Sequence, residues 1–300
     1  MLRMIDAFHP QFADKNIELV TPDVVQTLTE KELINLLPEV DAWIAGDDPA
    51  SRQVLQAGAQ GRLKALVKWG VGVDNVDFPA AERLGIKAAN TPGVFGREVA
   101  DLAMHYVTGL ARETFYIDRE IRHNHDWPKP SGISLAERTV ALVGFGDIGR
   151  QAARRFLAAD MHVLGYDPEF TPVQDLPVDH AYWPDRLEEA DFLVFTCPLT
   201  AGTYHLFNAH LLTRLKRGVR VVNVARGPII DEAALIQGLE SGVVESAALD
   251  VFEVEPLPAE SPLRRYKKCV FGAHNGSNTK DAVHRVSNAA IDTLFKFLGV

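Results

Sequence analysis

The chain has 300 residues, of which 31 are Lys or Arg and 40 are Asp or Glu, so its net charge is -9. This length corresponds to about two domains, and the acidic balance argues against nucleic acid as a partner. With two cysteines, no apolar run that could cross a membrane and no apolar signal segment, the sequence excludes a disulfide scaffold and a membrane protein and predicts a cytoplasmic one.

Short apolar runs in the first third of the chain are predicted to be strands. They cover 17–22, 40–46, 62–70 and 85–90, with 2–6 as the candidate for a strand before them. Because the intervals between them suit helices, the pattern predicts a small α/β domain with a parallel sheet. Apolar residues at helical spacing over 97–121 predict one long helix after this domain.

A second series of apolar, β-branched runs begins at residue 139. It covers 139–146, 161–167, 191–198, 219–227, 245–252 and 268–274, and an amphipathic helix over 282–298 follows. Six such strands alternating with helices are typical of a doubly wound dinucleotide-binding sheet. The predicted fold class is therefore α/β, with two Rossmann- or flavodoxin-like domains, doubly wound parallel sheets and a cleft between them where a ligand would bind.

The last helix is expected to return to the first domain. This predicts a discontinuous substrate domain of residues 1–95 plus 276–300 and an NAD-binding Rossmann domain of residues 96–275.

A glycine-rich GxGxxG loop, GFGDIG, follows the first strand of the second series and precedes a helix. Its glycines allow a tight turn, close approach of the backbone to a pyrophosphate and close helix packing. The next strand ends in Asp167, which would accept hydrogen bonds from the adenosine ribose and repel a 2′-phosphate, so NAD is favoured over NADP. The expected cofactor-binding residues here are Gly144, Gly146, Asp147, Ile148, Gly149 and Asp167.

Polar side chains also follow the later strands. Arg226 and His274 lie at the ends of their runs and Glu255 just past its run, and the carboxyl ends of parallel strands meet at one edge of a sheet. An arginine, a carboxylate and a histidine beside a nicotinamide would form an anion clamp and a general acid/base. The alternatives are a surface arginine, a solvated loop carboxylate and a structural histidine.

The remaining histidines are interpreted as surface or structural residues. His123 and His125 form an HxH pair, but no third ligand at a suitable spacing accompanies them, so no metal site is predicted.

Several motifs together resemble the D-isomer-specific 2-hydroxyacid dehydrogenases. The glycine loop with its second strand (144–168), the stretch that contains VNVARG (198–242), AALDVFEVEPLP (247–258) and AHNGSN (273–278) carry the likeness, and KWGVGVDNVDFPAAERLGIKAANTPG (68–93) agrees with it. The resemblance covers roughly residues 40–300. It implies that the protein interconverts a small D-2-hydroxy acid and its 2-keto acid with NAD.

The resemblance also implies roles for single residues. Arg226, Glu255 and His274 would form the catalytic triad, in which Glu255 orients the imidazole and favours its protonated form. The backbone amides of Val71 and Gly72 would hold the substrate carboxylate. Cys197 and Pro198 would line the adenosine side and Asp250 would lie near the nicotinamide carboxamide, and the expected cofactor-binding residues further include Thr203, Val224 and Ala225. Members of the family are cytoplasmic homodimers joined through the NAD domain.

The chain departs from the family pattern at Ala273, Asn275 and Asp101, none of which removes a catalytic group. Phosphoglycerate dehydrogenases of the family commonly carry an arginine for the substrate phosphate after the strand at 40–46, where this chain has Gly46-Asp47-Asp48-Pro49. Two carboxylates would repel a phosphate. Lys68 is a further candidate substrate-binding residue, and whether it or Arg97 compensates is open from the sequence.

Two other functions remain open at this point. One is an NAD(H)-binding regulator of the corepressor type that shares the fold, since fold alone does not fix function. The other is phosphoglycerate dehydrogenase itself.

Overall fold

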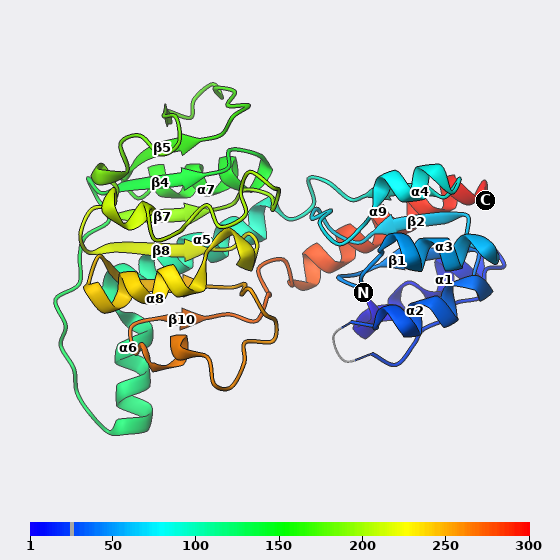
Figure 1. Ribbon diagram of the computed structural model, residues 1–300, viewed down its shortest axis with the longest axis horizontal. Coiled ribbons are helices and arrows are strands. Elements are labelled where there is room, and N and C mark those ends of the chain that lie inside the picture. The colour runs from blue at the N-terminus through cyan, green and yellow to red at the C-terminus, as the bar shows by residue number, and fades with distance from the viewer. Residues whose placement is uncertain (25–26) are drawn as a thin grey trace. The chain divides into compact units, whose positions relative to one another are not determined.

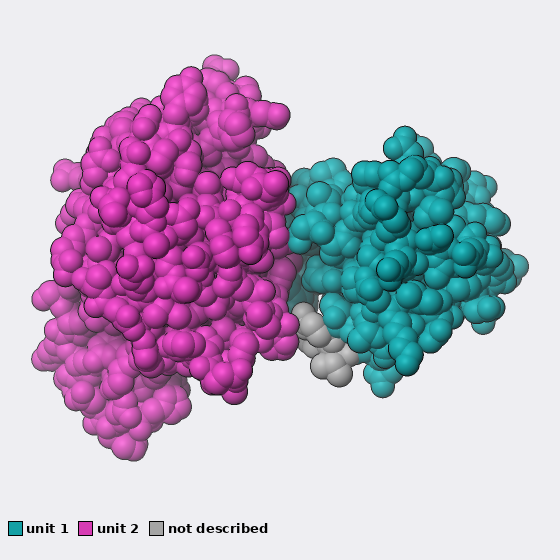
Figure 2. All heavy atoms as spheres, in the orientation of Figure 1, with its two compact units in different colours: residues 1–95, 278–300 teal, residues 96–277 magenta. Residues whose placement is uncertain are grey.

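The computed structural model describes residues 1–24 and 27–300, which divide into two compact units (Figure 2). Unit 1 comprises Met1–Phe95 and Asn278–Val300, and unit 2 comprises Gly96–Ser277. Both units are built on parallel sheets with helices, as the predicted α/β class requires. No helix in the described part of the chain is long and apolar enough to cross a membrane.

Unit 1 holds a three-stranded parallel sheet in the order β1-β2-β3, formed by Ala42–Ala45, Ala65–Lys68 and Lys87–Asn90. One face is covered by α2 (Glu30–Leu36), α3 (Arg52–Gln60) and α4 (Phe78–Arg83), whose apolar side chains pack on Leu66. The other face is covered by α9 (Lys280–Leu298), whose Ala290 and Leu294 pack on Val67 (Figure 1). Strand side chains alternate between the two faces, so both must be apolar.

The two strands predicted nearest the N-terminus are wrong. Residues Leu2–Ala7 form a 3-10 helix that leads into α1 (His9–Ala13), and 17–22 lie outside any strand. Phe8 and Phe12 are four residues apart, so both fall on one face of this helical segment and pack against Ile291 of α9. Ile17 and Leu19 pack against the same cluster from a segment without regular secondary structure, which explains why this segment is apolar.

Unit 2 contains a seven-stranded parallel sheet in the order β10-β9-β8-β7-β4-β5-β6 (Figure 1). The strands are β4 (Thr139–Val143), β5 (His162–Tyr166), β6 (Asp179–His180), β7 (Phe192–Phe195), β8 (Val219–Asn223), β9 (Val244–Leu249) and β10 (Val270–Phe271). Each of the six predicted strands is present, and β6 is an additional two-residue edge strand. The order reverses between β4 and β7, where open α/β sheets bind ligands.

The helices of unit 2 are α5 (Gly96–Arg112), α6 (Thr114–Arg119), α7 (Asp147–Leu157) and α8 (Glu232–Ser241), with a π-helical turn at Glu120–Asn124. Short 3-10 turns occupy Leu37–Glu39 in unit 1 and Leu187–Glu189, Leu211–Thr213, Gly227–Ile229 and Pro262–Arg265 in unit 2. The single helix predicted over 97–121 is broken because Glu113 adopts a left-handed conformation, φ 52°. The ring of Phe115 then folds back onto Gly109, where a Cβ atom would lie 2.1 Å from it.

Candidate active site

The glycine loop links β4 to α7 in unit 2. Gly144 has φ 97°, and a Cβ atom on it would lie 2.6 Å from the backbone nitrogen of Cys197, so only glycine fits there. A Cβ atom on Gly149 would lie 2.1 Å from the carbonyl oxygen of Gly144, which shows how closely α7 packs on the turn. Among the described residues, and apart from its neighbours in the chain, no heavy atom lies within 4 Å of where a Cβ of Gly146 would be. The backbone at the start of α7 is therefore open to an anion such as a dinucleotide pyrophosphate.

Asp167 follows β5 and lies against the glycine loop. One carboxylate oxygen accepts a hydrogen bond from the backbone N–H of Phe145 (2.7 Å), and the other accepts one from Glu169 (2.9 Å). These bonds fix the carboxylate at the carboxyl end of β5. Of the other expected residues of this loop, Ile148 is half-buried, and the carboxylate of Asp147 lies against Gly96 of α5, where a Cβ atom would be 2.3 Å away.

The segment after β7 presents Cys197, Pro198 and Thr203. The hydroxyl of Thr203 accepts from the backbone N–H of Thr200 (2.8 Å) and donates to the carbonyl of Pro198 (2.7 Å), so it stabilises the turn. Cys197 is 6% exposed, and burial raises the pKa of its thiol to about 12. The thiol is therefore neutral, and this segment can line a binding site but does not supply a nucleophile.

Arg226 follows β8, and its backbone is held by a buried amide. The Asn223 side chain, 1% exposed, donates to the carbonyl of Arg226 (2.9 Å) and accepts from the N–H of Ala225 (3.0 Å). The guanidinium of Arg226 donates to the carbonyl of Ala225 (2.9 Å), and Val224 and Ala225 are buried behind it. An uncharged amide inside an apolar strand is the sequence signal for this support.

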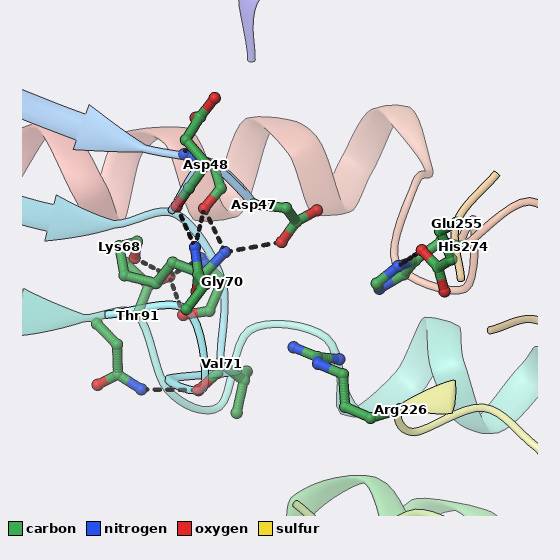
Figure 3. A network of polar contacts seen from close by, with 12 residues as sticks. Asp47, Asp48, Lys68, Gly70, Val71, Thr91, Arg226, Glu255 and His274 are labelled. Carbon is green, nitrogen blue, oxygen red and sulfur yellow. Dashed lines mark hydrogen bonds and ion pairs between the residues drawn. The ribbon is translucent and has the colours of Figure 1, made fainter. Parts of the chain in front are cut away.

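Glu255 and His274 are brought together although 19 residues separate them. Nδ1 of His274 lies 2.8 Å from one carboxylate oxygen of Glu255 (Figure 3). The other oxygen accepts from the backbone N–H of Phe252 (2.9 Å). Their side chains are 27% and 28% exposed, so the pair is reached by solvent. Because an ionised carboxylate only accepts, the imidazole carries its hydrogen on Nδ1 in this contact.

Asp250 supports the segment that carries His274 and is 2% exposed. Its carboxylate accepts from the backbone N–H groups of Asn275 (3.1 Å) and Gly276 (2.8 Å), and its carbonyl accepts from the N–H of His274 (2.7 Å). These bonds hold the turn in which His274 has φ 51°. The expected contact of Asp250 with the nicotinamide carboxamide stays a prediction.

Tyr106 of α5 also contacts Asp250, and it was not identified from the sequence as part of the site. Its hydroxyl contacts the carboxylate of Asp250, and burial followed by that negative charge raises the pKa of Tyr106. A Cβ atom on Gly272 would meet both groups, at 2.2 Å from Asp250 and 2.6 Å from Tyr106. The only signal in the sequence is a polar hydroxyl on the apolar face of a helix.

Unit 1 presents its own polar edge at the carboxyl ends of its strands. Lys68 ends β2 and is 2% exposed, and its Nζ donates to the carbonyl of Gly46 (2.6 Å) and to the carboxylate of Asp47 (2.9 Å) (Figure 3). The carboxylate of Asp48 accepts from the backbone N–H of Gly46 (3.2 Å). The positive charge of Lys68 is therefore balanced by the Asp47 carboxylate within the unit.

The loop after β2 carries Val71 and Gly72. The hydroxyl of Thr91 accepts from the N–H of Gly70 (2.8 Å), and the Asn90 side chain donates to the carbonyl of Val71 (2.9 Å). Val71 is 37% exposed. Arg97, the alternative to Lys68, belongs to unit 2, where its carbonyl accepts from Arg155 (3.2 Å).

Among residues 1–24 and 27–300, no group of three or more His, Cys, Asp or Glu side chains could hold a metal ion.

Comparison with known proteins identifies the family. Residues 104–276 match the family described as D-isomer specific 2-hydroxyacid dehydrogenase, NAD binding domain. A hydroxypyruvate reductase from Thermotoga maritima is 37% identical over 279 residues, which cover 91% of this chain and 90% of that protein. D-3-phosphoglycerate dehydrogenase 2 of Arabidopsis thaliana is 35% identical over 88% of this chain but only 43% of that protein.

Solved structures of other proteins share this fold. The NAD-dependent formate dehydrogenase from Staphylococcus aureus, solved in complex with NAD, superimposes with a TM-score of 0.85 and 25% sequence identity, covering 97% of this chain and 88% of that one. The matched NAD-binding domain lies within unit 2, which carries the glycine loop, and this confirms NAD as the cofactor. The chain therefore belongs to the D-isomer specific 2-hydroxyacid dehydrogenases and is an NAD-dependent enzyme of that family.

Proposed function

We propose that the protein reduces a short 2-keto acid with an uncharged tail, such as hydroxypyruvate, to the D-2-hydroxy acid, and catalyses the reverse oxidation. The observation that carries this proposal is the 2.8 Å contact between Glu255 and His274, at the sheet edge where Arg226 also follows its strand. A charged clamp beside a general acid/base is the equipment that a keto-acid reductase needs. The similarity to a hydroxypyruvate reductase supports the choice of substrate.

His274 acts as the general acid/base. In reduction, Nε2 of the imidazolium donates a proton to the carbonyl oxygen, and in oxidation the neutral ring removes the hydroxyl proton. Glu255 orients the ring through Nδ1 and stabilises its positive charge. Arg226 binds the substrate carboxylate and polarises the carbonyl, where negative charge develops in the transition state.

The glycine loop and Asp167 would hold NAD, the N-terminus of α7 binding its pyrophosphate and the Asp167 carboxylate its adenosine ribose. The open backbone at Gly146 and the fixed carboxylate of Asp167 support this assignment. Asp147, Ile148, Cys197, Pro198, Thr203, Val224 and Ala225 are proposed to line the same site. When bound, NAD supplies the hydride donor and acceptor of the reaction.

Unit 1 is proposed to be the substrate domain, with the backbone amides of Val71 and Gly72 holding the substrate carboxylate. Asp47 makes phosphoglycerate dehydrogenase the weaker candidate, because it balances the charge of Lys68, which a phosphate would otherwise use. A substrate with a neutral hydroxymethyl or hydrogen tail needs no positive charge there and is not repelled by the Asp47 carboxylate.

A panel of 2-keto acids tests the proposal. The rate of reduction of each acid by NADH is measured from the loss of NADH absorbance. Hydroxypyruvate, glyoxylate and pyruvate compare tails of different size, and phosphohydroxypyruvate is the charged counterpart of hydroxypyruvate. We expect a much higher kcat/KM for hydroxypyruvate than for phosphohydroxypyruvate. The reverse order would contradict the proposed substrate class.

We also propose that the enzyme is a cytoplasmic homodimer joined through unit 2, as the family resemblance implies. Ile121 and Trp127, 39% and 72% exposed, lie in the segment after α6 and support an interface there. Light scattering after size exclusion tests this: a monomeric mass would contradict it, and Trp127→Ala should weaken the dimer.

A further inference from the structure

A second histidine–glutamate pair lies in unit 2, outside the catalytic groups. Nε2 of His205 lies 2.6 Å from one carboxylate oxygen of Glu253, with the two side chains 31% and 29% exposed. The ring of Tyr204 stacks on His205 with centroids 4.0 Å apart and 16° between the planes. Glu253 stands two residues before Glu255, so both pairs draw their carboxylate from the same segment.

The same pair is bonded to the segment that carries Arg226. The backbone N–H of His205 donates to the carbonyl of Pro228 (2.8 Å), two residues after Arg226. The backbone N–H of Glu253 donates to the carboxylate of Glu232 (3.0 Å), at the start of α8. His205 therefore contacts the segment after β8 through its backbone and the segment after β9 through its ring.

Gly227 shows how closely these two segments pack. A Cβ atom on it would lie 1.8 Å from the carbonyl oxygen of Phe252 and 2.5 Å from the backbone nitrogen of Glu253. Nothing bulkier than a hydrogen separates the residue after Arg226 from the residue before Glu253. A shift of either segment therefore moves the other.

Two carboxylates meet at this junction and need hydrogen-bond donors. Burial, with a smaller contribution from the charge of Glu253, raises the pKa of Glu232. The imidazole of His205 donates to one oxygen of Glu253, and the other oxygen accepts from the backbone N–H of Glu232 (3.4 Å).

We propose that His205 and Glu253 form a positioning pair that fixes the Arg226 segment against the Glu255 segment, and so sets the geometry of the reacting groups. The proposal rests on the proposed roles of Arg226 and Glu255. Neither His205 nor Glu253 is assigned a contact with substrate or cofactor. Their effect is on kcat, because misplacement of reacting groups slows the chemical step more than binding.

The test uses four variants of the full chain, His205→Ala, His205→Gln, Glu253→Gln and the double variant His205→Ala with Glu253→Gln. His210→Ala is the matched control, an exposed histidine five residues further along the same segment. Steady-state reduction of hydroxypyruvate gives kcat and KM, fluorescence titration gives the Kd for NADH, and hydrogen exchange reports on the segments 226–231 and 251–255.

We expect His205→Ala to lower kcat by about 10- to 100-fold while the Kd for NADH changes by less than about twofold. His205→Gln should restore most of the kcat, because its amide can still donate to Glu253, and the double variant should be no worse than His205→Ala. Exchange should rise in both segments for His205→Ala and stay unchanged for His210→Ala.

Unchanged kcat in His205→Ala and Glu253→Gln, or effects that add in the double variant, would overturn the positioning role. Failure of His205→Gln to restore activity would also overturn it. Arg226→Lys is measured alongside to separate failure of the positioning role from failure of the proposed function. If Arg226→Lys also keeps full activity, the proposed function is wrong.

Discussion

Glu255 holds His274 through one carboxylate oxygen at 2.8 Å and its own segment through the other, which accepts from Phe252 at 2.9 Å. Both oxygens of the Glu255 carboxylate are thus bonded, which fixes its orientation. Asp250 holds the turn that carries His274 by accepting hydrogen bonds from three backbone N–H groups. In the proposed mechanism, this preorganisation would let the imidazole act on a substrate without reorganising during the reaction.

Glu255→Gln tests the charge in this pair. Without the carboxylate, the imidazolium of His274 loses a stabilising charge and gives up its proton at lower pH. Because the proposed reduction uses the protonated ring, the alkaline limb of its pH profile should move to lower pH, while activity survives at the new optimum. The measurement is kcat/KM against pH for both proteins, and superimposable profiles would make Glu255 a loop carboxylate.

Arg226→Lys tests the carboxylate clamp. A guanidinium can bind a carboxylate through two parallel hydrogen bonds, whereas an ammonium is a point charge. We expect kcat/KM for hydroxypyruvate to fall by about 10-fold or more, while the Kd for NADH stays near that of the unaltered enzyme. Arg217→Lys, at an exposed position of unit 2, is the control. Near-normal turnover of Arg226→Lys would exclude Arg226 from the site.

Asp167 is expected to set the cofactor preference. NADH should give a higher kcat/KM than NADPH by a free energy of about 1–3 kcal/mol, because the carboxylate repels a 2′-phosphate. Asp167→Asn removes the charge but keeps an acceptor for the backbone N–H of Phe145, so it should narrow the preference with the loop intact. Equal use of both cofactors by the unaltered enzyme would refute the assignment.

The two buried thiols predict how stability depends on pH. Burial raises the pKa of Cys197 to about 12 and that of Cys269 to about 11. In the unfolded chain a thiol loses its proton at about pH 8.5. The thiols therefore do not lower the free energy of unfolding below that pH, but they lower it as pH rises toward their pKa values in the folded protein. Thermal unfolding between about pH 8.5 and 10 should show this fall. The double variant Cys197→Ala with Cys269→Ala should flatten it, and parallel slopes would contradict the account.

The sheet of unit 2 was predictable because its strands are buried on both faces and read as continuous β-branched runs. Strand β6 was not, since Asp179 and His180 are polar and pair only at an edge. The 2–6 strand failed for a different reason. Its apolar residues also suit a helix, in which Met4 packs in the cluster with Ile291 of α9, and periodicity in so short a run does not separate a helix from a strand.

The glycine loop and the order of strand ends could be found from the sequence, because topology alone brings the ends of β8, β9 and β10 to one edge. The supporting hydrogen bonds could not. Tyr106 meets Asp250 from a helix about 140 residues earlier in the chain, and His205 meets Glu253 across 48 residues. Such pairs depend on packing that no local pattern encodes.

The most direct test of the central claim is the rate of NADH-dependent reduction of hydroxypyruvate, and of the reverse oxidation, by the unaltered enzyme and by His274→Ala, with NADH binding measured on both. Loss of the general acid/base should lower kcat in both directions by about 100-fold or more at every pH, while the Kd for NADH is retained. If His274→Ala keeps most of its activity in either direction, His274 is not the acid/base and the proposed mechanism is wrong.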